Sequence, residues 1–525
     1  MQESEAPIVR GMPGKLGGRK GHRSSRPSSC RARDANPNVA AVPQQRQGTR
    51  APRRKGSRRT SEPLEHKLFS VYGQILNERA LRDAWEKVRA NKGAGGVDGV
   101  TIARFEEDLD GNIARLLADL RAKTYRPSPV RRAYIPKKNG KRRPLGIPTI
   151  RDRIVQQALV TRLSPFFEEN VFHRDSCGSG PGMGVEDALK KVMWNLETGH
   201  RYVYDLDIKG YFDNIPHKKL MRVLNKYVSD GTVPGLVWRS PEAGYMEDDV
   251  TYETAAGTMQ GGVISPLLAN IYLNELDWEP PLAGLRFCRY ADDCIVMCRD
   301  EAELERAVVV VGETVAALGL ELSAEKTRVV DTREGDFDYL SFTFRRAHTF
   351  SDGNWKYWVT PTEASLTKFR RELKARTKKT YSKSFEQWAR EPDPVIRGKS
   401  DYFLAANRAA KAVWGECRRR GMGFHGQAKR SYDSLDAYVR QRLRVNIANR
   451  GKGKHAGQHA GKLMTVRYGN GFFLKEMGLV SGQYMADLLR NPGLTPDEFL
   501  ASRKRRRKWR GDPKTERFFA FANAR

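Results

Sequence analysis

The sequence has few cysteines, no long apolar runs and, next to its basic residues, few acids. Its six cysteines are scattered over 525 residues, which excludes a disulfide framework and favours an intracellular, reducing compartment. No run of about 20 apolar residues occurs and the start lacks a hydrophobic signal core, so we expect no membrane partner. The 62 acids stand against 94 Lys and Arg, a formal net charge of +32. A field of this sign concentrates polyanions, and nucleic acid is the first partner to expect.

Composition divides the chain into four parts. Residues 1–60 carry 15 Lys and Arg against three acids and few large apolar side chains. Such a segment cannot bury enough surface to offset its ordering entropy. We therefore expect a disordered basic leader over 1–64, a globular part over 65–345, a helical basic part over 355–490 and a basic tail over 491–525.

Two adjacent acids are the main chemical signal in the chain. Asp292 and Asp293 lie between two short apolar segments, 286–290 and 294–298, which predicts a β-hairpin with acids at its turn. Strict alternation would place the two carboxylates on opposite faces of the hairpin, and only the twist of a tight turn brings both to one site. Acids that merely solvate a turn are therefore an alternative.

A second acidic strand is predicted upstream, at residues 202–208. Asp205 and Asp207 alternate onto the same face, with Asp207 at the strand's end, and Asp213 follows just beyond. We expect Asp207 to project into a cleft, with Asp205 and Asp213 as rivals. Acids from neighbouring strands can hold two Mg²⁺ ions, because Mg²⁺ prefers hard oxygen ligands and substrate phosphates complete its octahedron.

Hydrophobic periodicity predicts an α+β domain in which helices cover one face of the acidic strands. Helical patterns cover 80–90, 104–121 and 151–169, and short strands are expected at 320–322 and 339–344. A further amphipathic helix that ends at Gly319 is predicted from a 4-3-4-3 stripe of Leu304, Val308, Val311, Val315 and Leu318.

Blocks in a fixed order surround these acids. They occupy residues 131–137 with 140–149, 207–215, 260–270, 289–293, 325–327 and 337–342. They include Gln260-Gly261-Gly262 and Tyr290-Ala291-Asp292-Asp293. In this order they resemble the reverse transcriptases encoded by group II introns, and the resemblance covers most of residues 65–490.

The resemblance implies a right-hand polymerase with fingers, a palm that contains the sheet and acidic hairpin, and an α-helical thumb and maturase domain. Asp207, Asp292 and Asp293 would be catalytic and bind two Mg²⁺ ions, with the Ile208 carbonyl as a backbone ligand. Nucleotide-binding residues would be Lys137 and Arg143 at the triphosphate, Phe212 at the sugar and Gln260 in the pocket. From the bare sequence, surface cations explain Lys137 and Arg143, and core packing explains Phe212.

The implied partners are the group II intron RNA, target DNA, a primer–template duplex and deoxynucleoside triphosphates, and a homodimer is left open. The implied location is a bacterial cytoplasm, in association with RNA and nucleoid, rather than an organelle. The last 100 residues contain no cysteine, so we expect no zinc-dependent HNH endonuclease domain.

The chain departs from the family pattern at residues 175–184. Cys177, Ser179, Gly180 and Met183 replace the usual Tyr, Phe and two Arg residues, which puts the grip on the template in doubt. Two alternatives follow: a domesticated or defence-associated reverse transcriptase, and a splicing-only maturase that acts as an RNA chaperone with an impaired polymerase.

Overall fold

A computed structural model describes residues 67–136, 142–178, 182–248, 250–253, 257–258, 261–348, 355–376 and 393–419, with Thr495 and Glu498. Contacts divide the chain into Met1–Arg53 and Arg54–Arg525, and every described residue belongs to the second unit. The expected leader, the maturase segment beyond 419 and all but two residues of the expected tail lie outside the described residues.

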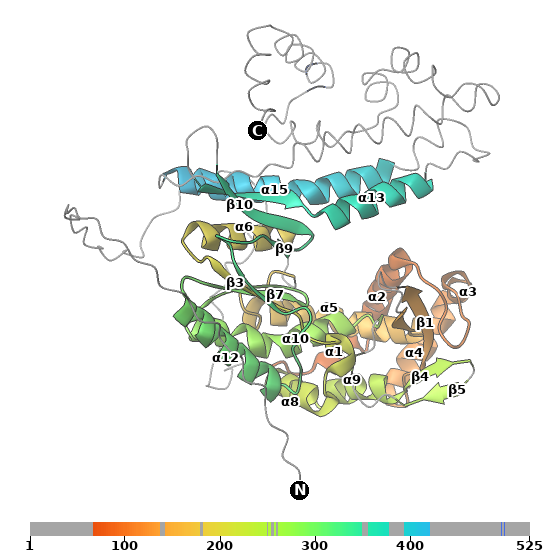
Figure 1. Ribbon diagram of the computed structural model, residues 1–525. Coiled ribbons are helices and arrows are strands. Elements are labelled where there is room, and N and C mark those ends of the chain that lie inside the picture. Colours follow the sequence, from red (N-terminus) through yellow and green to blue (C-terminus); the bar gives the residue numbers. More distant parts are fainter. Residues whose placement is uncertain are drawn as a thin grey trace, which may run out of the picture. The chain divides into compact units, whose positions relative to one another are not determined.

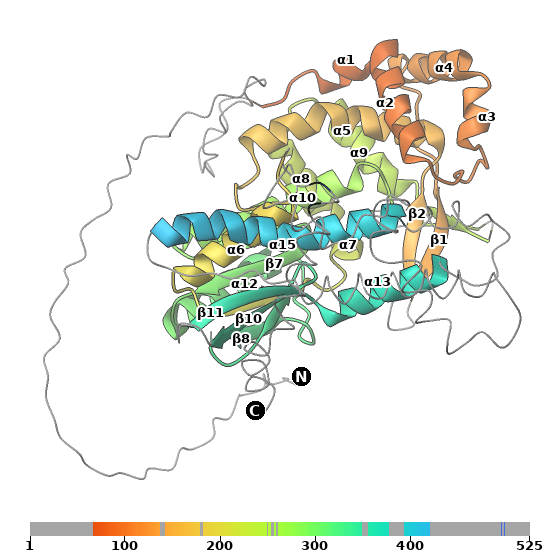
Figure 2. The ribbon, with the colours of Figure 1, turned by 90° about the horizontal axis from the view of Figure 1, so that it is seen from above.

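The first described part is a group of helices: α1 (Val71–Ile75), α2 (Glu78–Asn91), α3 (Ile102–Glu106), α4 (Leu109–Arg121) and α5 (Ile150–Asn170). α1 and α2 pack on the long α5 (Figures 1 and 2). The helices predicted at 80–90 and 151–169 are confirmed. The helix predicted over 104–121 is two helices, because the Asp108 carboxylate accepts a hydrogen bond from the Gly111 N–H (3.2 Å) and starts α4 anew.

A four-stranded sheet adjoins these helices. Its order is β2-β1-β4-β5, and its strands are β1 (Val130–Pro136), β2 (Arg142–Ile147), β4 (Tyr245–Glu247) and β5 (Val250–Tyr252). β1 and β2 form an antiparallel pair in which Ile135 lies opposite Arg143. This register places Arg143 near the end of a projecting hairpin.

A second four-stranded sheet, antiparallel throughout, contains the acidic segments in the order β6-β7-β3-β8. Its strands are β6 (Arg286–Tyr290), β7 (Asp293–Cys298), β3 (Tyr202–Leu206) and β8 (Arg328–Asp331). The helices in this part of the chain are α7 (Tyr211–Asn214), α8 (His217–Tyr227), α9 (Thr232–Glu242), α10 (Ser265–Asp277), α11 (Glu279–Leu282) and α12 (Glu301–Ala317). Of these, α11 and α12 contact its strands most extensively.

Both faces of this acidic sheet are buried, so the expectation of helices on one face only is wrong. Tyr204 and Leu206 belong to a core with α5, α8, α10 and α12. Val203 and Ile295 alternate onto the opposite face and belong to a second core. Apolar side chains on both faces of a strand require cover on both sides.

The second core is built by α6 (Val185–Glu197) and by a sheet of β9 (Phe337–Tyr339), β10 (Phe342–His348) and β11 (Trp355–Pro361). α13 (Glu363–Arg376) and α15 (Asp393–Arg419) complete it, and α15 runs along α6 (Figures 1 and 2). β10 and β11 pair across the expected domain boundary between 345 and 355. Residues on both sides of that boundary therefore share one core.

Three local predictions are wrong. On α12 the residue Val308 is 42% exposed, and Ala307 is buried in its place. No strand forms at 320–322, where Leu322 makes only an isolated bridge to Ile208. The strand expected over 339–344 is broken at Leu340 and Ser341, whose φ angles of 50° and 65° turn the chain between β9 and β10.

Candidate active site

The paired acids lie at a two-residue hairpin turn, as predicted. Tyr290 at the end of β6 pairs with Asp293 at the start of β7, which leaves Ala291 and Asp292 as the turn. Ala291 has a φ of 55°, a left-handed conformation that residues other than glycine rarely adopt. The turn therefore bends sharply enough to present two consecutive carboxylates.

The third acid comes from the neighbouring strand. β3 pairs with β7 so that Leu206 lies opposite Cys294, and Asp207 follows directly. Desolvation and then the carboxylates of Asp292 and Asp207 raise the pKa of Asp293 to about 6. Asp207 and Asp292 therefore lie close enough to Asp293 to act on its charge, and whether all three carboxylates serve one site stays a prediction.

Asp205 lies beside this cluster. Desolvation raises its pKa to about 6, in part opposed by Arg328, and the carboxylates of Asp293 and Asp207 add to the increase. Asp205 is therefore close enough to the acids to feel their charge. The sequence had named it as a rival of Asp207, and the fold keeps it in the same electrostatic cluster.

A lysine from a distant part of the chain faces Asp207. The Lys326 Nζ donates to both carboxylate oxygens of Asp207, at 3.0 and 2.9 Å. Thr327 supports the same residue, since its hydroxyl accepts a hydrogen bond from the Asp207 N–H (3.3 Å). The segment after α12 therefore supplies the positive charge beside the acids.

The oxygen donors near this turn are of the kind that Mg²⁺ prefers. Within the described residues, no three His, Cys, Asp or Glu side chains already surround a common point as a metal site. The Asp207 and Lys209 backbones bond to Ser323 and Glu321, at 2.7 and 2.9 Å, and no described group donates to the Ile208 carbonyl between them. Carboxylates plus a carbonyl fit Mg²⁺, which commonly completes its shell with water and substrate phosphate.

The segment 175–178, where the chain departs from its family pattern, lies against the acidic hairpin. The Arg289 N–H donates to the Asp175 carbonyl (3.0 Å), and the Cys177 N–H donates to the Arg289 carbonyl (2.7 Å). A Cβ on Gly178 would be only 2.7 Å from the Ala291 nitrogen. Cys177 is buried. This segment therefore flanks the edge of β6 and touches the turn.

Arg289 itself is fully buried beneath the turn. Its Nε and Nη2 bond to the two carboxylate oxygens of Asp277, at 2.6 and 2.5 Å, and its Nη1 bonds to Asn270 Oδ1 at 2.9 Å and the Ala291 carbonyl at 2.8 Å. The sequence analysis placed Arg289 and Lys326 within family blocks but assigned a role to neither, and it did not name Asp277. Membership of a family block does not show which residue a side chain contacts, so these contacts could not be predicted.

The expected nucleotide pocket is partly described. Arg143 is exposed on β2, and Phe212 is half-buried against the first core with Tyr211 as its ring neighbour. Lys137 and Gln260 lie outside the described residues. Gly261 approaches β2 so closely that a Cβ would be 2.5 Å from the Gly146 carbonyl oxygen, and its φ of 110° also favours glycine.

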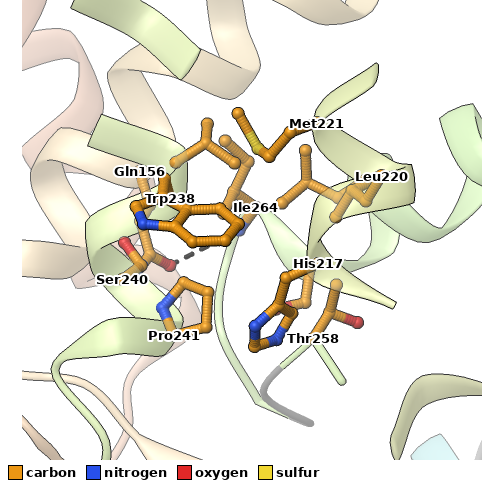
Figure 3. A pocket seen from close by; sticks show the side chains of 12 residues that line it. Gln156, His217, Leu220, Met221, Trp238, Ser240, Pro241, Thr258 and Ile264 are labelled. Atoms are coloured by element: carbon orange, nitrogen blue, oxygen red, sulfur yellow. Dashed lines mark hydrogen bonds between the residues drawn. The ribbon is translucent and has the colours of Figure 1, made fainter. Parts of the chain in front are cut away.

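Behind the loop that follows Gly261 is a small apolar cavity (Figure 3). The Gln156 side chain reaches this loop and accepts hydrogen bonds from the Val263 and Ile264 N–H groups, at 2.8 and 3.5 Å. The cavity measures about 20 Å³, and Trp238 forms one of its walls. That volume holds a water molecule but no nucleotide, and none of the carboxylates above lines it.

The sequence of this chain is similar to those of known proteins. Residues 135–344 match the family model described as Reverse transcriptase (RNA-dependent DNA polymerase). The chain is 33% identical over 305 residues to protein YkfC of Escherichia coli (strain K12), a match that covers 50% of this chain and 79% of YkfC. It is 38% identical over 224 residues to the group II intron-encoded protein LtrA of Lactococcus lactis subsp. cremoris, which covers 42% of this chain and 37% of LtrA.

Two further matches are weaker. An uncharacterized 91 kDa protein in the cob intron of Schizosaccharomyces pombe is 33% identical over 218 residues, which is 41% of this chain and 26% of that protein. A solved partial Cas6-RT-Cas1–Cas2 complex aligns at 18% identity over 48% of this chain and 43% of its own, with a TM-score of 0.31. That structural likeness is too slight to bear on function. The match to LtrA spans little more than a third of that protein.

Proposed function

The chain belongs to the reverse transcriptase (RNA-dependent DNA polymerase) family, among the group II intron-encoded reverse transcriptase/maturases, and on this premise we propose that it copies RNA into DNA at the Asp207, Asp292 and Asp293 cluster. The observation that carries the proposal is that the strand pairing sets Asp207, which follows β3, beside the β6–β7 turn with Asp292 and Asp293. Desolvation first, and then the carboxylates of Asp292 and Asp207, raise the pKa of Asp293 to about 6. An anionic cluster of this kind is stabilised by divalent cations.

Two Mg²⁺ ions would be held by the three carboxylates and the Ile208 carbonyl. Bound there, they would activate the primer 3′-hydroxyl and neutralise the leaving pyrophosphate. The protein's own task is to hold the acids in position through the sheet register and the bent turn. Lys326 donates to both carboxylate oxygens of Asp207. It would have to release them before both oxygens could coordinate a metal ion.

The incoming nucleotide would meet the fingers hairpin. Arg143 is exposed on β2, which suits the neutralisation of a triphosphate, and Lys137 would act with it. Phe212 would lie against the sugar and favour deoxynucleotides, and Gln260 would line the pocket. The close approach of the Gly261 and Gly146 backbones supports direct contact between this loop and the fingers hairpin.

The partners follow from the family and the charge. We propose that the chain binds a group II intron RNA, assists its splicing and copies the inserted intron at a DNA target on a primer–template duplex. Fingers and palm would occupy 65–345, and the thumb and maturase domain 355–490. No described helix is long and apolar enough to span a membrane, and we propose a cytoplasmic location in association with RNA and nucleoid. One copy carries the whole carboxylate set, so the proposal needs no homodimer.

The two alternatives are not favoured. The named relatives of at least 30% identity include two intron proteins, which speaks against a defence-associated enzyme. The three acids and Arg143 are all present, and the segment 175–178 packs in an ordered way against the turn, which argues against an impaired polymerase.

The test is primer extension on poly(rA)/oligo(dT) with Mg²⁺ and dTTP, with Asp292→Ala beside the wild type. We expect DNA synthesis by the wild type and its loss by several orders of magnitude in the variant, because a metal ligand is removed. Asp213→Ala is the matched control: it deletes the acid that the sequence named as a rival near β3, and it should keep activity.

The same variants should be tested for binding and splicing of a group II intron RNA. RNA binding and splicing assistance should survive in Asp292→Ala, since the carboxylate serves chemistry and not RNA contact. DNA synthesis by Asp292→Ala would refute the assignment of the acids. An inactive wild type that still binds RNA would instead favour the splicing-only maturase.

A further inference from the structure

A buried ion pair lies directly beneath the catalytic turn. Arg289 and Asp277 are both 0% exposed, and they join β6 to the last residue of α10. Burial alone disfavours the charge on Arg289, yet Asp277 raises its pKa above the ordinary value, so the side chain remains a guanidinium. A buried ion pair is weak evidence for stability, because apolar residues of similar volume often serve as well. Stability alone is therefore a weak explanation for a buried ion pair at this point.

Four of the five N–H donors of the guanidinium have defined acceptors. Two bond to Asp277, one to Asn270 Oδ1, and one to the Ala291 carbonyl oxygen (2.8 Å). The Arg289 main chain is held as well, since its N–H and carbonyl pair with Asp175 and Cys177. The guanidinium is therefore held in one orientation by groups on α10 and in the β6–β7 turn.

The bond to Ala291 acts on the catalytic turn itself. The Ala291 carbonyl and the Asp292 N–H belong to one planar peptide, so fixing the oxygen fixes the plane from which Asp292 projects. Ala291 has a left-handed φ of 55°, which a residue with a Cβ adopts only when its surroundings enforce it. Gly178 also lies close to this turn, and it approaches the backbone from the strand edge.

We propose that Arg289, locked by Asp277 and Asn270, is the positioning residue of the active site: it orients the Ala291–Asp292 peptide so that Asp292 and Asp293 point into the metal site together. This inference rests on the proposed function, because it assigns a role to Arg289 in the chemistry at those acids. Arg289 touches neither substrate nor metal and acts only through the turn.

Single variants of a buried pair leave an unpaired charge and risk unfolding. The decisive variant is therefore Asp277→Leu/Arg289→Met, which replaces both partners with apolar side chains of similar volume and removes the bond to Ala291. We expect a melting temperature and a primer–template affinity close to those of the wild type. We expect kcat on poly(rA)/oligo(dT) to fall on the order of 100-fold, because a small displacement of a reacting group has that effect.

A second readout does not depend on catalysis. Mn²⁺ binding to the free protein, followed by electron paramagnetic resonance, should weaken roughly tenfold in the double variant, since two carboxylates that no longer converge chelate poorly. The matched control is Asp119→Leu/Arg151→Met, which removes an ion pair between α4 and α5 and should leave kcat and Mn²⁺ binding unchanged. A folded double variant with wild-type kcat and Mn²⁺ binding would overturn the proposal.

If the double variant does not fold, Arg289→Lys tests the positioning role of Arg289 instead. A lysine keeps the charge opposite Asp277, but its ammonium cannot also span Asn270 and the Ala291 carbonyl. We expect a folded protein with kcat lowered about tenfold or more, on the same argument of misplacement. Wild-type kcat in this variant overturns the positioning role. Failure of the proposed function looks different, because the wild type itself would then be inactive or Asp292→Ala would remain active.

Discussion

The Lys326 ammonium group lies 2.9 Å from one carboxylate oxygen of Asp207 and 3.0 Å from the other, although 119 residues separate the two in the chain. A cation of the protein therefore faces a carboxylate that we assign to a metal. If Asp207 binds Mg²⁺ as proposed, the metal and Lys326 would compete for the same carboxylate oxygens.

Replacing this lysine should strengthen metal binding to the free protein. In Lys326→Met we expect Mn²⁺ affinity, measured by electron paramagnetic resonance without nucleic acid, to rise by roughly two- to fivefold. The gain is modest because the Lys326 side chain is 65% exposed and solvent screens the pair. Lys209→Met is the matched control, since Lys209 lies nearby but pairs with Glu321 at 3.1 Å. Equal Mn²⁺ affinities in the two variants would contradict the competition.

Gly178 should be intolerant of any side chain. In Gly178→Ala the new Cβ would approach the Ala291 nitrogen to 2.7 Å, a distance at which the backbone of the turn must shift. We expect primer-extension kcat to fall by about 10- to 100-fold while the protein still folds.

Gly184→Ala is the control for this substitution. It lies in the same family block, and a Cβ there meets nothing within 4 Å. It should keep nearly full activity. A Gly178→Ala variant as active as Gly184→Ala would mean that the turn tolerates displacement, and would also weaken the role of Arg289.

The sequence predicts the acidic hairpin well because its signals are local. Apolar segments on either side of two acids define both strands. The structure confirms the hairpin, with Asp292 in the turn and Asp293 as the first residue of β7 rather than in the turn. The position of Asp207 directly after β3 agrees with the predicted strand over 202–208. Each of these features depends on residues within a few positions of one another.

The contacts that organise the site depend on pairings between distant elements, which one sequence does not reveal. Neither the Arg289–Asp277 pair nor the cover over Val203 has a local signal. The error at Val308 has a different cause. Residues 308–311 are all valine, so the sequence does not decide which of these valines lie on the buried face of α12. Packing against the core selects the phase with Ala307, Val311 and Val315 inside.

Glu197 should make the protein less stable as the pH rises. Its Oε1 is buried with no hydrogen-bond partner among the described residues. Desolvation raises its pKa from 4.5 to about 7, against the opposing influence of Arg346 and Lys356. Between those two values the folded state retains a proton that the unfolded state has released, so the free energy of unfolding falls as the pH rises through this window.

Glu197→Gln removes this dependence. We expect the variant to match the wild type near pH 4.5 and to be more stable by roughly 1–3 kcal/mol near pH 8, as measured by chemical denaturation at both values. Glu305→Gln, the same change on an exposed residue of α12, should have little effect at either pH. A stability difference that does not change with pH would show that Glu197 does not titrate in this way.

The exposed face of α13 should contribute to nucleic-acid affinity through charge. Lys368, Arg371 and Lys374 are exposed on this helix, while Leu366, Phe369 and Leu373 are buried in the second core. Each cation that neutralises a phosphate releases condensed counterions, so affinity falls linearly with the logarithm of salt concentration. In Lys368→Ala/Arg371→Ala/Lys374→Ala we expect the slope for a primer–template duplex to become shallower by about 2 to 3, since each contact contributes about 0.9.

The measurement is fluorescence anisotropy of a labelled duplex over a series of salt concentrations. Because phosphate contacts carry no sequence information, the loss should be the same for duplexes of different sequence. Glu363→Ala/Glu372→Ala on the same helix is the control with acids removed, and its slope should be unchanged or slightly steeper. A triple variant with the wild-type slope would place the duplex elsewhere, away from α13.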